Sequence, residues 1–256
     1  MKKELMEVQR QEQLAESIFR LELSGTLVRQ MQKPGQFVHV KTGGAYAPLL
    51  RRPISIAEID NEKDTFTMIY RAEGEGTLQL SGLRKGDQVD VLGPLGNGFD
   101  PDAEIPGTTA LLAGGGIGVP PLYELSKRLK NHGVNVIHVL GFQNERNVFY
   151  HNEFAALGET YVATVDGSYG EKGFVTDVIK NNNLVFNSVF AVGPNVMLKA
   201  MENSFPDNRM FLSLEERMGC GIGACFACVC KTAEGSYKKI CVDGPVFQAG
   251  EVLIPC

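Results

Sequence analysis

The most informative stretch of this chain is Ala110–Pro121, ALLAGGGIGVPP. An apolar run leads into a dense glycine turn, and Pro120 and Pro121 suit the first turn of a helix. A strand, a glycine turn and a helix in this order are typical of the first unit of a doubly wound α/β domain. Glycines lack β-carbons, so a pyrophosphate can approach their backbone and meet the free amides of the helix N-terminus. The stretch therefore predicts a parallel sheet with a nucleotide site at its edge.

The glycine turn differs from the dinucleotide fingerprint, which has glycine at its first, third and sixth positions. A tight connection that binds nothing is therefore the alternative to a nucleotide site. Two later loops, 166–170 and 193–197, also follow predicted strands, and ligands of open parallel sheets bind beyond the carboxyl ends of the strands. We therefore predict one shared crevice with the contact residues Gly114, Gly115, Gly116, Ile117, Gly118, Gly193 and Pro194.

The residues around the turn support a doubly wound domain. Apolar runs alternate with helical stretches from residue 108 to about 213, as expected for a parallel sheet covered by helices. We expect about five strands, at residues 109–113, 134–141, 160–165, 185–192 and 210–214. The helices between them are expected at residues 120–132, 148–157, 174–182 and 195–204.

The first hundred residues have a different pattern. Short strands with alternating apolar side chains are separated by glycine and proline, which is typical of an antiparallel barrel of about six strands. Strands are expected at residues 19–23, 36–40, 53–59, 66–70 and 88–92, with a short helix from Thr77. Glycine and proline crowd residues 93–107 and mark a boundary. We therefore predict three parts, which are a barrel domain (1–100), an α/β domain (101–214) and a cysteine-bearing tail (215–256).

The composition excludes several classes of protein. Of 256 residues, 43% are hydrophobic and 21% are charged, so the chain can bury a core and is not disordered. The net charge of -5, without a long run of either sign, argues against nucleic-acid binding. Residues 1–7 interleave charges, unlike a signal peptide, and the longest uncharged run, 105–123, is broken by glycine and proline. We therefore expect a cytoplasmic protein without a membrane span.

A second candidate site begins at Arg51–Ile56, RRPISI, where two cations and a hydroxyl stand at the start of a predicted strand. Residues 69–77, IYRAEGEGT, add a tyrosine, an arginine and a Gly-Thr pair before a helix. Arginine can hold a phosphate, a tyrosine ring can stack and free amides can bind anions, which are the needs of a flavin nucleotide. The alternative is an exposed arginine pair and an ordinary barrel tyrosine. The predicted contact residues are Arg52, Pro53, Ile54, Ser55, Ile69, Tyr70, Arg71, Gly76 and Thr77.

All six cysteines lie between residue 220 and the C-terminus, which favours a metal site over disulfides that hold a whole domain together. Cys220, Cys225 and Cys228 have the Cys-x4-Cys-x2-Cys spacing of plant-type 2Fe-2S proteins. A fourth thiolate follows at Cys241. We therefore predict that these four residues hold a 2Fe-2S cluster.

Zinc held by four cysteines is the alternative to this cluster. Such zinc sites usually have two Cys-x2-Cys pairs, and this chain has one. Cys230 competes with Cys241 as the fourth ligand, but a strand at Val229–Lys231 would point it away from its neighbours, so we expect a structural role for it. Cys256 is assigned no role.

The order of these motifs resembles the ferredoxin-NADP reductase superfamily. The similarity covers residues 4–214 and includes the Arg52–Ser55 strand, the glycine turn and the Gly193-Pro194 loop. It implies FAD on the barrel and a nicotinamide nucleotide on the α/β domain. Many members have an aromatic residue at the position of Ile54, so Tyr70 becomes the alternative ring for flavin stacking.

With its tail included, the chain resembles the electron transfer subunits of NAD-linked, type B dihydroorotate dehydrogenases. The matching motifs are 50–55 (LRRPIS), 93–98 (GPLGNG), 215–225 (EERMGCGIGAC) and 243–247 (DGPVF). In that family a separate FMN-containing subunit oxidises dihydroorotate to orotate in pyrimidine (UMP) biosynthesis, and two subunits of each kind assemble. The resemblance implies that electrons pass from the 2Fe-2S cluster to FAD and then to NAD+.

The chemistry of such a relay requires no side-chain acid or base, so we predict no catalytic residue. FAD has to stand between the cluster and the nicotinamide, because it exchanges electrons with both one-electron and hydride partners. Two other interpretations stay open, which are a related FAD and iron-sulfur subunit serving a sulfide- or ferredoxin-linked partner, and a nucleotide-binding module with a zinc tail. Glu145 disfavours the 2'-phosphate of NADP and Arg146 favours it, so the preference for NAD rests on the resemblance.

Overall fold

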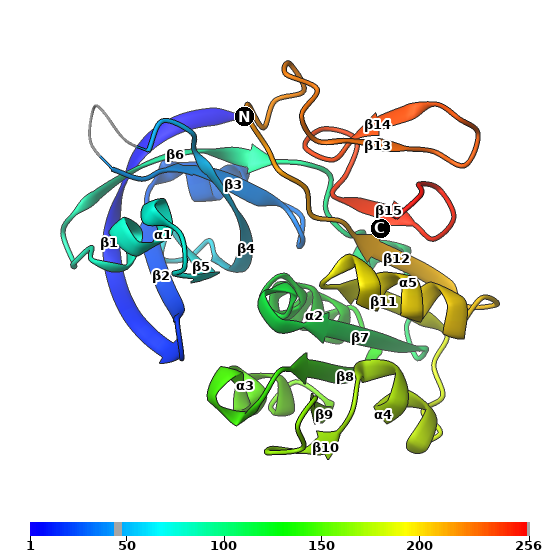
Figure 1. Ribbon diagram of the computed structural model, residues 1–256. Helices are drawn as coiled ribbons and strands as arrows, with labels where there is room; N and C mark the ends of the chain where they lie inside the picture. The colour runs from blue at the N-terminus through cyan, green and yellow to red at the C-terminus, as the bar shows by residue number, and fades with distance from the viewer. Residues whose placement is uncertain (44–47, 255–256) are drawn as a thin grey trace.

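The computed structural model describes residues 1–43 and 48–254. A barrel lies beside an α/β sheet, and the C-terminal tail lies above one edge of the sheet, next to the barrel (Figure 1). The predicted fold class, an antiparallel barrel followed by a parallel-sheet domain and a cysteine-bearing tail, is confirmed.

Six antiparallel strands close the barrel in the order β1-β2-β5-β4-β3-β6. They are β1 (Lys2–Ala15), β2 (Ile18–Ser24), β3 (Phe37–Lys41), β4 (Arg52–Asp60), β5 (Thr65–Arg71) and β6 (Gln88–Leu95). The 3-10 helix η1 (Thr26–Gln30) follows β2, and helix α1 (Glu75–Ser81) follows β5. Alternate side chains point into the barrel, where Val38, Val40, Val89 and Val91 are buried.

Strand β1 closes the barrel, although the sequence pattern did not predict it. It pairs with β2 on one side and with β6 on the other. Only Met6 and Val8 of its 14 residues are buried. Charged residues and glutamines fill most of the other positions, so the apolar alternation that indicates a strand is too short to recognise.

The second sheet has seven strands in the order β10-β9-β8-β7-β11-β12-β15. They are β7 (Thr109–Gly115), β8 (Asn135–Phe142), β9 (Glu159–Thr164), β10 (Glu171–Lys172), β11 (Ser188–Val192), β12 (Arg209–Ser213) and β15 (Val246–Gln248). The helices are α2 (Pro121–Asn131), α3 (His151–Ala155), α4 (Val175–Asn181) and α5 (Asn195–Ser204), with 3-10 turns at Pro101–Ala103 (η2), Gly116–Gly118 (η3) and Glu145–Asn147 (η4). The five predicted strands are confirmed, and all run parallel.

The winding of this sheet reverses between β7 and β11. Strands β8 and β9 follow on one side of β7, while β11 and β12 follow on the other. Open α/β sheets bind ligands beyond the carboxyl ends of their strands at such a reversal. The glycine turn follows β7 and the Gly193-Pro194 loop follows β11, so the topology brings both to this point.

Helix α3 is shorter than the sequence pattern predicts. Phe149 and Tyr150, which precede it, are buried in the α/β core. Tyr150 has a φ of 59°, outside the helical region, and its ring meets Tyr123 edge-on at 5.3 Å between centroids. Aromatic packing therefore prevents the helix from starting before His151.

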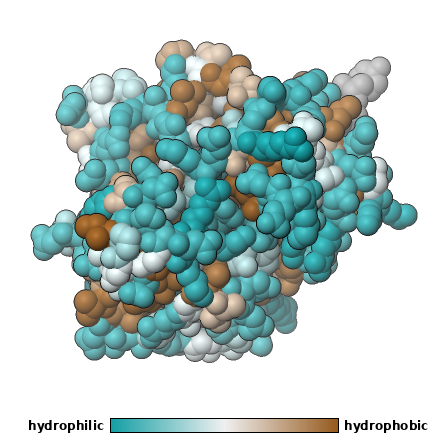
Figure 2. All heavy atoms as spheres, turned by 180° about the vertical axis from the view of Figure 1, so that it is seen from behind, coloured by the Kyte–Doolittle hydropathy of each residue, from teal (hydrophilic) through white to brown (hydrophobic). Residues whose placement is uncertain are grey.

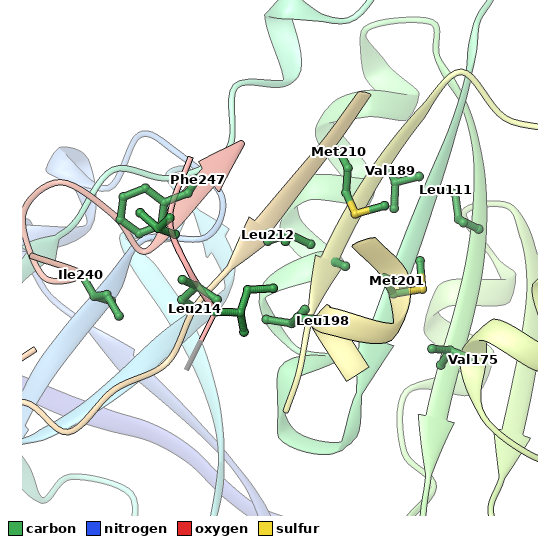
Figure 3. Packing of buried hydrophobic residues seen from close by; sticks show 14 of the residues in the cluster. Leu111, Val175, Val189, Leu198, Met201, Met210, Leu212, Leu214, Ile240 and Phe247 are labelled. Atoms are coloured by element: carbon green, nitrogen blue, oxygen red, sulfur yellow. The ribbon is translucent and has the colours of Figure 1, made fainter. Parts of the chain in front are cut away.

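The tail is anchored to the edge of the sheet. Its strand β15 pairs antiparallel with β12, and β13 (Val229–Lys231) forms a hairpin with β14 (Tyr237–Lys239). Figure 3 shows Ile240 and Phe247 of the tail packed next to Leu214 and continuing the hydrophobic core of the sheet. The tail therefore shares a core with the α/β domain, and the limits at residues 100 and 214 stay predictions.

The face opposite to that of Figure 1 is mostly hydrophilic, with hydrophobic residues in small groups (Figure 2). Among the described residues, no helix combines the length and the apolar character needed to cross a membrane.

Candidate cofactor sites

A crevice of about 730 Å³ lies at the carboxyl ends of the parallel strands. The glycine turn supplies Gly115–Gly118 and the loop after β11 supplies Gly193 and Pro194. Arg71 reaches the crevice from the end of β5, so the barrel forms one of its walls. The structure therefore brings the predicted nucleotide residues together, except for Gly114, which faces Val119 and does not line the crevice.

Glycine is favoured at two positions of the turn for different reasons. A β-carbon at Gly118 would stand 2.4 Å from the carbonyl oxygen of Val192, so the turn can pack against β11 only without one. Gly116 has a φ of +54°, and a β-carbon there would point toward Arg71 at 3.6 Å. Gly118 thus serves the tight connection, whereas the left-handed backbone at Gly116 favours glycine where the turn lines the crevice.

The third predicted loop contributes differently from the expectation. None of residues 166–170 lines the crevice, and its neighbours Val165 and Gly173–Thr176 do. Ser168 instead accepts a hydrogen bond from the backbone of Glu145 at 2.8 Å and so supports the loop after β8. The sequence located the correct edge of the sheet but not the residues that face the cavity.

Two of the predicted flavin residues, Arg52 and Gly76, meet in a small polar cradle on the barrel. A β-carbon at Gly76 would stand 2.5 Å from Thr42 Oγ1 and 2.9 Å from Arg52 Nε, so the cradle depends on glycine there. Thr42 is 3% exposed, and its hydroxyl has no partner among the residues that the structure describes. A buried hydroxyl beside a guanidinium suits an anionic oxygen, as in a pyrophosphate. The sequence does not predict Thr42 as a site residue, because no motif or spacing relates it to Arg52.

Tyr70 belongs to the core of the barrel. It is 3% exposed, its ring stacks on Phe19, and its hydroxyl accepts a hydrogen bond from Gln11 Nε2 at 2.8 Å. Burial raises the pKa of this phenol to about 12. Ile69, the residue before it, is also buried. The structure supports Arg71 as the member of this trio that faces a site.

Arg71 lies close to two carboxylates. Its Nε lies 3.5 Å from Oε1 of Glu73, and Glu215 lines the same crevice. Glu215 keeps some contact with solvent in the crevice, but the protein around its carboxyl reduces solvation and raises the pKa. The positive charge of Arg71 acts in the opposite direction and lowers this pKa. Glu215 was not predicted as a site residue, because it lies outside both nucleotide motifs.

The first two predicted cluster ligands are held by backbone amides. The Sγ atom of Cys220 accepts hydrogen bonds from the amides of Ile222, Ala224 and Cys225 at 3.3–3.4 Å. The Sγ atom of Cys225 accepts one from the amide of Cys220 at 3.4 Å. Burial alone would raise the pKa of Cys220, but these donors outweigh it and lower the pKa to about 6. The loop therefore favours the thiolate, which is the form that binds metal.

The other two predicted ligands form a buried pair. Cys228 and Cys241 are each 2% exposed. Burial and the neighbouring Cys228 thiol raise the pKa of Cys241 to about 12. Among the described residues, no three Cys, His, Asp or Glu side chains form a group suited to one metal ion. Two thiol pairs suit a two-iron centre with two thiolates on each iron.

The remaining cysteines are separate from these pairs. Cys230 lies on β13, is 4% exposed and packs in the same hydrophobic core as Phe247. Its Sγ donates to the carbonyl oxygen of Lys238 at 3.5 Å, and burial raises the pKa of the thiol. These contacts support the predicted structural role, while Cys256 lies outside the described residues.

A barrel with an anion cradle, a nucleotide crevice and a four-cysteine tail define a reductase of the ferredoxin-NADP reductase type with an added iron-sulfur domain. Residues 215–253 match the iron-sulfur cluster binding domain of dihydroorotate dehydrogenase B. The chain is 58% identical to the dihydroorotate dehydrogenase B (NAD(+)) electron transfer subunits of Bacillus cereus and Bacillus anthracis, over 99% of this chain and 100% of each relative. The chain belongs to this family of electron transfer subunits, as the sequence predicts.

Solved structures agree with this assignment. A structure of the NADH-dependent reduced ferredoxin-NADP oxidoreductase, described for flavin-based electron bifurcation, is 33% identical with a TM-score of 0.86, covering 98% of this chain and 90% of that chain. The Amycolatopsis cytochrome P450 reductase GcoB has a TM-score of 0.67 at 24% identity, covering 80% of this chain and 66% of that chain, and shows the fold alone.

Proposed function

We propose that this chain is the electron transfer subunit of a NAD-linked dihydroorotate dehydrogenase in pyrimidine biosynthesis. It accepts electrons from a catalytic partner subunit and delivers them to NAD+ through a 2Fe-2S cluster and FAD. The observation that carries the proposal is the order of the three candidate sites. The cysteine tail lies against the barrel, where the amide of Asn97 donates to Gly244 at 2.6 Å, and the barrel meets the nucleotide crevice at Arg71.

The barrel residues are assigned to FAD. The Arg52 guanidinium and the Thr42 hydroxyl hold the pyrophosphate, and Gly76 and Thr77 give it room at the start of α1. Ile54 and Ser55 follow on β4, and Arg71 at the end of β5 faces the nicotinamide side. When bound, FAD exchanges hydride with a nicotinamide and single electrons with a cluster. The chain's own residues bind and orient the cofactors, and none acts as an acid or a base.

The crevice is assigned to NAD. The backbone of Gly115–Gly118 and of Gly193-Pro194 would lie close to the nucleotide. Gly116 has no side chain between the nucleotide and Arg71. Glu145 and Arg146 lie together in η4, so their charges do not by themselves select against a 2'-phosphate. The preference for NAD over NADP is taken from the names of the relatives.

The cysteines are assigned to the cluster as two pairs, with Cys220 and Cys225 on one iron and Cys228 and Cys241 on the other. The backbone donors to Cys220 and the contact between Cys228 and Cys241 support this pairing. Cys225 is the exposed member of the set, so the cluster would have one face toward solvent.

The partner is assigned to this exposed face, which we call the cluster rim and define as Ile222, Cys225, Phe226 and Val242. The three apolar side chains are 46%, 62% and 44% exposed in that order, although apolar groups usually avoid water. We propose that the FMN-containing dihydroorotate dehydrogenase catalytic subunit covers the cluster rim, and that two subunits of each kind assemble in the cytoplasm.

Reconstitution with the catalytic subunit tests this function. The purified chain is expected to contain FAD, iron and acid-labile sulfide, and the complex is expected to reduce NAD+ with dihydroorotate. Zinc in place of iron would contradict the cluster assignment. Reduction of NAD+ with a sulfide- or ferredoxin-linked partner, and none with dihydroorotate, would support the related reductase instead.

A further inference from the structure

The imidazole of His39 is enclosed between the barrel and the cysteine loop. It is 0% exposed and lies on β3, where its neighbours Val38 and Val40 point into the barrel core. His39 therefore points outward, toward the tail. A β-carbon at Gly221 would stand 2.7–2.9 Å from three ring atoms of His39, so the ring packs directly on the residue that follows Cys220.

The hydrogen bonding of this ring is incomplete in the chain alone. Neither Nδ1 nor Nε2 has a partner among the described residues. Burial, and secondarily the charge of Arg51, lower the pKa of the imidazole to about 4, so the ring is neutral near pH 7. A neutral imidazole still has one N–H donor and one acceptor nitrogen. A buried donor without an acceptor is costly, so packing alone does not explain a histidine at this position.

The surroundings of the His39 ring indicate which acceptor its N–H group faces. The ring of His39 meets Phe37 at 5.9 Å between centroids and also packs on the backbone at Gly221, so the cysteine loop is polar backbone that the ring contacts directly. The amides of this loop already donate to the sulfur of Cys220. His39 also pairs with Pro53 on β4, the strand that carries the proposed FAD residues.

We propose that His39 is a positioning residue for the iron-sulfur centre, whose ring N–H donates a hydrogen bond to a sulfur at the Cys220 side and raises the reduction potential of the cluster. This inference rests on the proposed function. A donor to cluster sulfur stabilises the additional negative charge of the reduced cluster more than the oxidised state. His39 thereby favours electron entry into the cluster from the partner.

The midpoint potential of the cluster tests the proposal directly. We would titrate the reduced 2Fe-2S signal by electron paramagnetic resonance in the full chain loaded with FAD, using wild type, His39→Leu and His39→Gln. The expected result is a more negative potential in His39→Leu and a smaller shift in His39→Gln, which keeps a donor. His132→Gln is the control, because His132 bonds the carbonyl of Glu104 in the α/β domain, and no shift is expected there. An unchanged or more positive potential in His39→Leu, with the cluster intact, would overturn the inference.

A second measurement covers the case in which His39→Leu loses the cluster. Wild-type chain labelled with ¹⁵N-histidine is examined by pulsed electron paramagnetic resonance of the reduced cluster. One imidazole ¹⁵N coupling is expected, and it should disappear in His39→Gln. Its absence from the wild-type spectrum would overturn the inference. A wild-type chain with no 2Fe-2S signal would instead contradict the proposed function, so the two failures are distinguishable.

Discussion

Arg51 and Arg52 are adjacent residues with different partners. The Arg51 guanidinium donates to Asp90 Oδ1 at 2.9 Å and to the backbone carbonyls of Asp90 and His39, so it ties barrel strands together. The Arg52 guanidinium donates to the backbone carbonyl of Leu50 and lies beside Gly76 and Thr42, and no carboxylate among the described residues pairs with it. One arginine therefore stabilises the barrel, while the other is available for an anion.

Arg52→Ala is expected to weaken FAD binding. Loss of a charged hydrogen bond costs about 1.5–3 kcal/mol, which corresponds to roughly a 10- to 100-fold higher Kd for FAD. The flavin content of the purified protein and the Kd for FAD, after removal of the flavin and titration with FAD, can both be measured by flavin fluorescence. Arg51→Ala is the matched control and should lower stability while leaving the FAD affinity near that of wild type. Equal FAD affinity in Arg52→Ala and wild type would contradict the assignment.

Cys225→Ser and Cys230→Ser should have opposite outcomes. The first removes a proposed ligand, so the cluster spectrum and dihydroorotate-linked NAD+ reduction should be lost, whereas NADH oxidation by a small artificial acceptor at FAD should persist. The second changes a buried structural thiol that bonds Lys238, so the cluster should be retained with a modest loss of stability. Iron analysis and visible spectra check both. The ligand set would be wrong if Cys230→Ser lost the cluster and Cys241→Ser kept it.

The turn between β7 and α2 packs against the sheet and also lines the crevice. Gly118 allows contact with the end of β11, and Gly116 adopts a left-handed conformation that opens toward Arg71. The same three-residue turn, η3, therefore sets both the packing of the sheet and the shape of the crevice.

Gly116→Val is expected to raise the KM for NADH by about tenfold while FAD stays bound, because the side chain would enter the crevice and add roughly 1–2 kcal/mol of backbone strain. Gly107→Val is the matched control, since Gly107 has a φ of +85° but no atom within 4 Å of its β-carbon position. The control should be destabilised similarly with unchanged NADH kinetics. Loss of FAD in Gly116→Val with normal NADH kinetics would reverse the assignment of the two domains.

Some helices and strands can be predicted from sequence patterns and others cannot. The alternation of apolar residues predicts barrel strands such as β2, and apolar runs predict the buried strands of the parallel sheet. Strand β1 is not predicted in this way, because only Met6 and Val8 are buried. Helix α3 was predicted too long, because the burial of Phe149 and Tyr150 depends on distant aromatic partners.

For the whole molecule, the tail connects the sheet, the barrel and the proposed partner. Its core residues Ile240 and Phe247 pack on the sheet (Figure 3), while Asn97 and His39 of the barrel contact its loops. Its exposed apolar residues remain on the cluster rim. In the proposed function, electrons from the partner would enter at this exposed edge and leave at the nucleotide crevice of the same chain.

Phe226→Ala is expected to weaken assembly with the catalytic subunit without removing the cluster. An exposed aromatic at the centre of an interface contributes about 2 kcal/mol or more, so the Kd should rise at least roughly 30-fold. Calorimetry of the cluster-loaded chain measures this change. Val185→Ala, at a residue that is 83% exposed on another loop, should leave the Kd unchanged. Unaltered affinity in Phe226→Ala with an intact cluster would place the interface elsewhere.

The two sheet types, the glycine turn, the four-cysteine spacing and the family can all be predicted from the sequence, because they depend on residues close together in the chain. Three other features are visible only in the folded protein. Thr42 lies beside Arg52, and His39 packs against Gly221. Arg71 and Glu215 both line the crevice. These contacts join residues from separate strands and domains, and no periodicity or spacing records them. Their positions follow from barrel closure and from packing of the tail on the sheet, which are set by burial of the whole core.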